Sequence, residues 1–144
     1  MRGFIVFALL QITASPAVAA DWRLALVGEE SDLGRTLAFV DVESLERVGS
    51  NLKFRVDMRI ERPPVTADGT RGHISADCAE RWFEVGEASY YRGSEWLKPA
   101  PSEARQPAGP GTNMGALLDN VCAGRFLSET VDPVAYAHSY LGKK

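Results

Sequence analysis

The sequence is poor in the side chains that build metal centres and nucleophilic active sites. Its 144 residues include only two histidines, His73 and His138, and two cysteines, Cys78 and Cys122. A metal site needs several ligands at compatible spacing, so we expect no metal and no cofactor. The sequence also lacks a Gly-x-Ser-x-Gly turn and a Gly-rich phosphate loop followed by lysine. These absences argue against a nucleophile-elbow hydrolase and a phosphate-loop nucleotide-binding protein.

Basic side chains are scarce as well. The 16 Lys and Arg residues are outnumbered by 19 Asp and Glu residues, which gives a net charge of −3. Proteins that bind nucleic acid neutralise phosphates with clustered Lys and Arg, and this sequence contains no such cluster. Nucleic acid is therefore not an expected partner.

Long apolar runs are absent after the first 20 residues. Those residues have a basic Arg2 near their start, continue with an apolar run over residues 4–10 and end in the small side chains of residues 17–20. This pattern predicts a secretory signal peptide over residues 1–20, cleaved after Ala19 or Ala20. The alternative is a membrane anchor, but the run is much shorter than the roughly 20 residues of a spanning helix. We expect residues 21–144 to form one domain without a membrane span.

The expected export determines how the two cysteines are interpreted. An even cysteine count in a chain sent to an oxidising compartment favours a disulfide. Joining Cys78 to Cys122 would stabilise the fold by roughly 4 kcal/mol in the chain-entropy model. The alternatives are two buried free thiols or one catalytic thiol.

Residues 52–61 carry the clearest structural signal in the chain. Apolar and charged residues alternate there without interruption, which predicts a central antiparallel strand with one buried face and one face in water. The apolar face needs a helix or a second layer as cover. Its members are Leu52, Phe54, Val56, Met58 and Ile60, and the expected wet face holds Lys53, Arg55, Asp57, Arg59 and Glu61.

Four further segments before the helices follow from local patterns. Trp22, Leu24 and Leu26 are expected to share one face of a first strand, and Asp41 to start one helical turn over residues 41–47. Residues 73–85 read as one or two strands with a bulge near Ala79 or Glu80, followed by a hairpin turn at Gly86-Glu87. Residues 98–112 contain four prolines and are expected to form a loop.

Two helices are expected near the C-terminus. Thr112 or Asn113 caps the first, whose apolar stripe is formed by Met114, Leu117, Leu118, Val121 and Cys122. This stripe brings Cys122 toward the face that holds Cys78. Asp132-Pro133 opens a short peripheral helix. The predicted fold class is therefore α+β: a small antiparallel β-sheet with one face packed by a C-terminal α-helix and stapled by a disulfide.

Two sets of residues are candidates for function. Tyr91 and Trp96 could form an aromatic contact patch for a partner, although core packing explains them as well. Asp77 could serve a small envelope hydrolase as a catalytic carboxylate, whereas the simpler interpretation places it on the wet side of a strand.

Several short motifs together resemble the bacterial surface-adhesin protein E-like domain. They are FVDVESLERVG at residues 39–49, ADCAER at 76–81, YYRG at 90–93, PGT at 110–112 and VC at 121–122. The resemblance covers residues 22–122. It implies a small antiparallel sheet packed on a helix, a disulfide between Cys78 and Cys122, export by a Gram-negative bacterium and an adhesin-like role.

The leading hypothesis is thus a non-enzymatic binding or accessory protein of the cell envelope, periplasmic or secreted, with a protein as its partner. The alternative is an envelope hydrolase that uses carboxylates near Asp77. A third hypothesis is a homodimer formed by pairing of an exposed edge strand.

Overall fold

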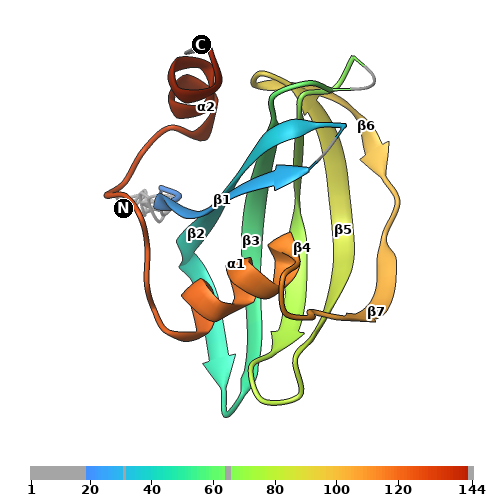
Figure 1. The fold of residues 1–144 in the computed structure, drawn as a ribbon, viewed down its shortest axis with the longest axis vertical. Helices are drawn as coiled ribbons and strands as arrows, with labels where there is room; N and C mark the ends of the chain where they lie inside the picture. Colours follow the sequence, from blue (N-terminus) through green and yellow to red (C-terminus); the bar gives the residue numbers. More distant parts are fainter. Residues whose placement is uncertain (1–18, 31, 64–65, 143–144) are drawn as a thin grey trace, which may run out of the picture.

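The computed structural model describes residues 19–30, 32–63 and 66–142, which form an antiparallel sheet and two helices (Figure 1). The expected signal peptide lies outside the described residues except for its last two. The elements are β1 (Trp22–Glu30), β2 (Gly34–Val48), β3 (Asn51–Ile60), β4 (Gly69–Asp77), β5 (Trp82–Arg92), β6 (Glu95–Ala100), β7 (Glu103–Pro107), α1 (Asn113–Cys122) and α2 (Pro133–Leu141). The α+β class is therefore confirmed.

The strands follow one another in space as they do in sequence, in the order β1-β2-β3-β4-β5-β6. The last strand, β7, pairs with the first half of β5, and β6 pairs with its second half. As predicted, β3 is an inner strand with antiparallel partners on both sides. Helix α1 packs on one face of the sheet and α2 on the other, and we call these the α1 face and the α2 face (Figure 1).

The α1 face holds the larger core. Leu52, Phe54 and Val56 of β3 are buried there with Leu117 and Leu118 of α1, as their spacing predicts. Helix α1 begins where the sequence indicates, because the Thr112 hydroxyl accepts a hydrogen bond from the Gly115 amide at 3.0 Å. No helix among residues 19–30, 32–63 and 66–142 is long and apolar enough to span a membrane.

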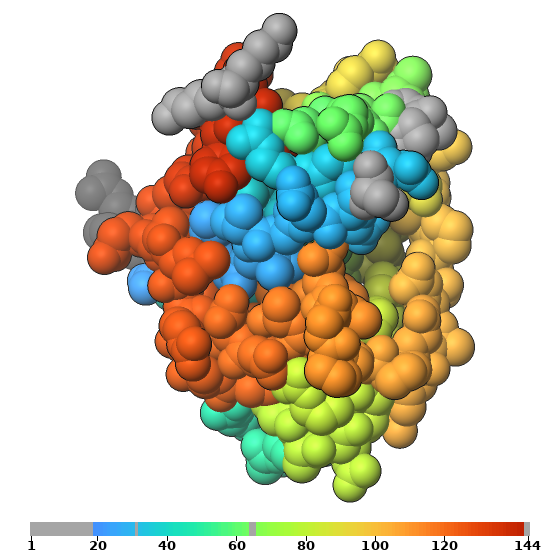
Figure 2. Space-filling model, in the orientation of Figure 1, coloured from blue at the N-terminus to red at the C-terminus, as the bar shows by residue number. Residues whose placement is uncertain are grey.

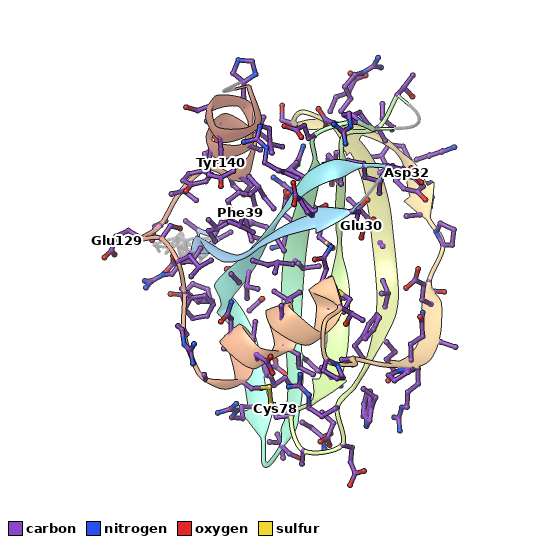
Figure 3. The ribbon with its side chains drawn as sticks, in the orientation of Figure 1. Glu30, Asp32, Phe39, Cys78, Glu129 and Tyr140 are labelled. Atoms are coloured by element: carbon purple, nitrogen blue, oxygen red, sulfur yellow. A yellow bond between two sulfur atoms is a disulfide. The ribbon has the colours of Figure 1, made fainter. Side chains whose placement is uncertain are left out.

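The disulfide between Cys78 and Cys122 is present, with the two Cα atoms 5.9 Å apart. It joins the turn after β4 to the last residue of α1 (Figure 3). The predicted link between helix and sheet is therefore confirmed.

The helical turn predicted over residues 41–47 is wrong, because β2 continues through it to Val48. The pairing with β3 jumps there, from Asp41 opposite Arg55 to Glu46 opposite Lys53. Asp41 accepts a hydrogen bond from the Glu43 amide at 3.2 Å, and Ser44 Oγ donates to the Asp41 carbonyl at 2.6 Å. Asp41 therefore makes the hydrogen bonds of a capping residue, but here they stabilise a bulge in a strand.

The turns around β5 also differ from the prediction. The chain turns over residues 78–81, where a bulge was expected, and it does not turn at Gly86-Glu87, because β5 runs without a break to Arg92. Asp77 explains the first turn, since its Oδ1 accepts the amides of Ala79 and Glu80, each at 2.8 Å. The loop predicted over residues 98–112 is partly wrong as well, because it contains the end of β6 and all of β7.

Helix α2 is not peripheral, which corrects another expectation. It covers a second cluster on the α2 face that includes Trp22, Phe39 and Ala137. Phe39 lies between the sheet and α2, with its ring 5.7 Å from that of Tyr136 (Figure 3). A register shift between Leu24 and Leu26 places Trp22 and Leu24 in this cluster and Leu26 in the other. The first strand therefore divides its apolar residues between two faces.

The segment after α1 protects the edge of the sheet at β1. The amides of Leu127 and Val131 donate to the carbonyls of Leu24 and Trp22 at 2.7 and 2.9 Å. Asn120 Nδ2 of α1 donates to the Ala25 carbonyl at 2.7 Å. This edge is therefore already occupied by the protein's own chain.

Candidate functional site

The best candidate site lies on the part of the α2 face that α2 leaves open. Strand pairing sets Arg55 of β3 opposite His73 of β4, and Tyr91 of β5 opposite Trp96 of β6. Residues that face each other in an antiparallel pair point to the same side of the sheet. We call this surface the arginine–aromatic face, and its members are Trp22, Arg55, Arg71, His73, Tyr91 and Trp96.

Arg71 is the centre of this surface. Its guanidinium carbon lies 5.3 Å from the ring centroid of Trp22 and 5.2 Å from that of Tyr91. Cation–π contacts of this length are attractive, so both rings hold the guanidinium in place. Arg71 retains 27% exposure of its side chain, so it can still meet a partner.

The buried carboxylate of Asp57 holds Arg71 in place. Arg71 Nε donates to Asp57 Oδ2 at 2.5 Å, and the Asp57 side chain is fully buried. The same carboxylate accepts two hydrogen bonds from Arg59, at 2.7 and 2.9 Å. The expected wet face of β3 is thus wrong at its centre, because Asp57 and Arg59 are buried beneath other elements.

Arg59 links this ion pair to the loops at the end of the sheet. Its Nη1 donates to the Gly93 carbonyl at 2.7 Å and to Asp68 Oδ1 at 3.3 Å. Burial alone would lower the pKa of Arg59, but hydrogen bonds to Asp57 and the charges of Asp57 and Asp68 outweigh burial and raise it. Arg59 therefore stays charged and holds Asp57 in place.

Arg55 extends the surface on the other side of Trp22. Its guanidinium carbon is 5.2 Å from the Trp22 ring centroid, and its Nη1 is 3.4 Å from Asp41 Oδ2. Its side chain is 41% exposed. Trp22 therefore contacts two arginines at once, one from β3 and one from β4.

The structure brings together the two residues predicted as a contact patch, Tyr91 and Trp96. They face each other across the β5–β6 pair, and Trp96 is 54% exposed. Tyr91 is half-buried beside Arg71. A shallow hollow of about 210 Å³ lies beside Tyr91 and is lined in part by Arg55, Arg71 and Tyr91. The patch is therefore broad and open.

The two histidines have separate positions. His73 is exposed in β4, which is an inner strand of the sheet. His138 is exposed on α2. Within residues 19–30, 32–63 and 66–142, no cluster of three or more His, Cys, Asp or Glu side chains is arranged to hold a metal ion.

Asp77 has a structural role in the turn after β4. Besides the two backbone amides, it accepts a hydrogen bond from Ser50 Oγ at 3.0 Å. The Glu80 amide, with help from Ser50 and Ala79, holds the pKa of Asp77 below its usual value. Asp77 is 7% exposed rather than on a wet face. These contacts favour an ionised turn residue over a general acid.

Sequence reasoning missed Trp22 and Arg71 as members of the site. The polar side of β4 follows from its alternation, so Arg71 could have been placed beside Arg55. No local pattern shows which face of the sheet Trp22 occupies, because that face depends on the register shift between Leu24 and Leu26.

No protein-family model and no curated protein matches this sequence. Among solved structures, the chain is similar to Haemophilus influenzae protein E in its crystal form II, with a TM-score of 0.54 and 13% identity. The match covers 77% of this chain and 95% of that one. The two proteins therefore share a fold, which agrees with the architecture that the sequence motifs imply.

Proposed function

We propose that this chain is an exported, non-enzymatic binding protein of the Gram-negative cell envelope, and that the arginine–aromatic face binds a protein partner. One observation carries the proposal. Arg71 contacts the rings of Trp22 and Tyr91 and is anchored by buried Asp57, and Tyr91 is paired across the strands with the exposed Trp96. Arg, Tyr and Trp dominate the binding energy of protein interfaces.

The rigidity of these side chains supports the proposal further. Binding is weakened by the entropy lost when flexible side chains become ordered, and Arg71 has already lost much of that freedom through its contacts. An exposed arginine without such supports would lose it only on binding. The arrangement is thus suited to a partner surface with a carboxylate or a backbone carbonyl opposite Arg71.

A protein partner fits this surface better than a small molecule. The hollow of about 210 Å³ beside Tyr91 is below the roughly 300–1,000 Å³ of typical ligand pockets, while a second hollow of about 540 Å³ extends the surface from Trp22 and Arg71 toward residues 130–133. Protein interfaces, in contrast, are broad and need no deep cavity. The hydrolase alternative receives no support from Asp77, whose oxygens are engaged by three donors.

The shared fold with protein E supports the family relation suggested by the motifs, and with it an adhesin-like role. Under this proposal residues 1–20 are a signal peptide, residues 21–144 are one surface-adhesin protein E-like domain, and the product is periplasmic or secreted. Cell fractionation with an epitope tag after Lys144 tests the location, and a tag found in the cytoplasm would contradict export.

Differential capture tests the binding surface. The tagged protein, exported from its full-length sequence, is used to retain proteins from envelope extract and from host matrix. We expect Trp96→Ala and Tyr91→Ala to lose a retained protein that the unchanged chain captures. Leu127→Ala is the matched control, since Leu127 is 51% exposed, close to the 54% of Trp96, and belongs to the segment beside β1.

The result depends on the contrast between these variants. A protein retained equally by all four chains binds elsewhere, and the arginine–aromatic face would then not be the site. Failure of the unchanged chain to retain any protein from either source would contradict the proposed function itself.

A further inference from the structure

The α1 face contains a groove that α1 does not fill. Helix α1 covers the lower part of this face, and the space-filling view shows a hollow beyond the helix, between β1 and the β6–β7 side of the sheet (Figure 2). Two adjoining hollows of about 340 and 400 Å³ lie there. Both are lined by Met58, Thr70 and Tyr90, so they form one elongated groove. Each has a volume typical of a ligand site.

The floor of the groove is apolar. Val56 and Ile74 come from the inner strands, and Phe83 and Val85 from β5. Two methionines, Met58 and Met114, lie along it, and their unbranched side chains adapt readily to a flexible apolar ligand. This lining suits an alkyl chain.

One buried polar group in the groove has no partner. Thr36 is 1% exposed and contributes to the second hollow, and its hydroxyl oxygen makes no hydrogen bond with any residue that the structure describes. Thr36 pairs with Ile60 and therefore points to the α1 face. Buried hydroxyl groups are almost always hydrogen-bonded, so an orphan at a hollow indicates a missing partner.

The charged side chains that line the groove are acidic, which disfavours an acidic ligand. Glu30 and Asp68 line the second hollow and Glu103 lines the first, whereas no Lys or Arg is among the described residues that line either. Asp68 is paired with Arg59 at 3.3 Å, so Glu30 and Glu103 set the local charge. Lys98 lines neither hollow, although its Nζ lies 5.7 Å from the centroid of the Tyr90 ring. A carboxylate or phosphate head group would lack a cationic partner in the lining.

We propose that this groove binds a single-chain amphiphile with an uncharged head group, such as a monoacylglycerol. Its alkyl chain lies along Met58 and Met114, and the Thr36 hydroxyl donates a hydrogen bond to the ester carbonyl of the head group. This inference goes beyond the proposed function, because the groove and the arginine–aromatic face are on opposite sides of the sheet.

Calorimetry with three probes of equal chain length tests the groove. The protein, exported from its full-length sequence and stripped of lipid, is titrated below the micelle threshold with 1-monolauroylglycerol, laurate or dodecyltrimethylammonium. We expect one monolauroylglycerol per chain and at least about tenfold weaker binding of laurate, which meets Glu30 and Glu103. No binding of monolauroylglycerol, or equal or tighter binding of either charged probe, overturns the proposal.

Two variants locate the site. Thr36→Val keeps the side-chain shape and removes the unpaired hydroxyl, so Tm should rise while affinity for monolauroylglycerol falls about fivefold. Val85→Trp fills the groove and should abolish binding, and Tyr91→Ala, on the other face, should leave it unchanged. Unchanged affinity in Thr36→Val would overturn the assignment even if Val85→Trp fails to fold.

Discussion

Asp57 and Arg59 form a two-point ion pair inside the α2 side of the sheet, with N–O distances of 2.7 and 2.9 Å. The Asp57 side chain is fully buried and that of Arg59 is 3% exposed. Two residues of one strand thus neutralise each other on the side of the sheet that α2 covers. The pair also holds Arg71, so the binding surface depends on it.

Removal of one partner of this pair should destabilise the fold strongly. We expect Asp57→Ala to lower the free energy of unfolding by about 3–5 kcal/mol, because it leaves the Arg59 charge buried without its carboxylate. The double variant Asp57→Leu/Arg59→Met should lose less than the single one. Urea unfolding measures both.

The more exposed Arg23–Asp21 pair provides the control. Arg23→Ala should lower the free energy of unfolding much less than Asp57→Ala does, because water screens an exposed ion pair. An equally small loss in Asp57→Ala would show that the buried pair does not support the sheet.

Gly69 should be intolerant of a side chain, because a Cβ added there would lie 2.5 Å from the guanidinium carbon of Arg59. Arg59 is held by Asp57 and cannot move away freely. We expect Gly69→Ala to cost about 1–3 kcal/mol in thermal or urea unfolding. Gly109→Ala is the matched control, since a Cβ there meets nothing within 4 Å, and it should be nearly neutral. Equal effects of the two substitutions would contradict the close contact.

The disulfide should supply a large part of the stability. Cys78 and Cys122 are 44 residues apart in sequence, so loss of their bond should lower the free energy of unfolding by roughly 4 kcal/mol. The comparison is urea unfolding with and without dithiothreitol. Cys78→Ser/Cys122→Ser should have the lower free energy of unfolding with or without the reductant. A reductant effect in that double variant would mean that the loss comes from elsewhere.

Asp77 should contribute to unfolding in acid. Its pKa in the folded protein is below the unfolded value of 3.8, chiefly through the Glu80 amide, so ionised Asp77 stabilises the fold above pH 3.8. This contribution is lost as the pH falls from 3.8 through the folded pKa. In Asp77→Asn the free energy of unfolding should therefore depend less on pH in that range. Ser50→Ala removes one of the hydrogen-bond donors to Asp77 and should reduce the pH dependence by a smaller amount. An unchanged acid slope in Asp77→Asn would refute this role.

A homodimer formed by strand pairing should use the β6–β7 edge, since the segment after α1 occupies the β1 edge. Pro99 and Pro101 lack the amide donors of a continuous ladder, so such a dimer should be weak. Light scattering over a range of concentrations should show a mass that rises from one chain toward two. A constant single-chain mass at all concentrations would exclude the dimer.

Local patterns were sufficient for part of this structure. The alternation of residues 52–61 predicted β3 and its buried side, and the stripe from Met114 to Cys122 predicted α1 and its orientation. The Thr112 and Asp132 caps lie where they were expected, and the cysteines are paired. These features depend on residues close together in sequence, or on one chemical pairing, and a single sequence contains that information.

Other features were decided by contacts between distant segments. The turn predicted at Asp41 became a bulge because β1 and β3 both pair with β2 as far as Asp41, and β3 pairs with it again from Glu46 onward. Asp57 and Arg59, at the centre of the charged side of β3, are buried, and α2, more than 70 residues later, packs against this strand. Alternation by itself therefore established which residues of β3 share a face. Only the tertiary structure decided what covers each face, because burial depends on which distant elements pack there.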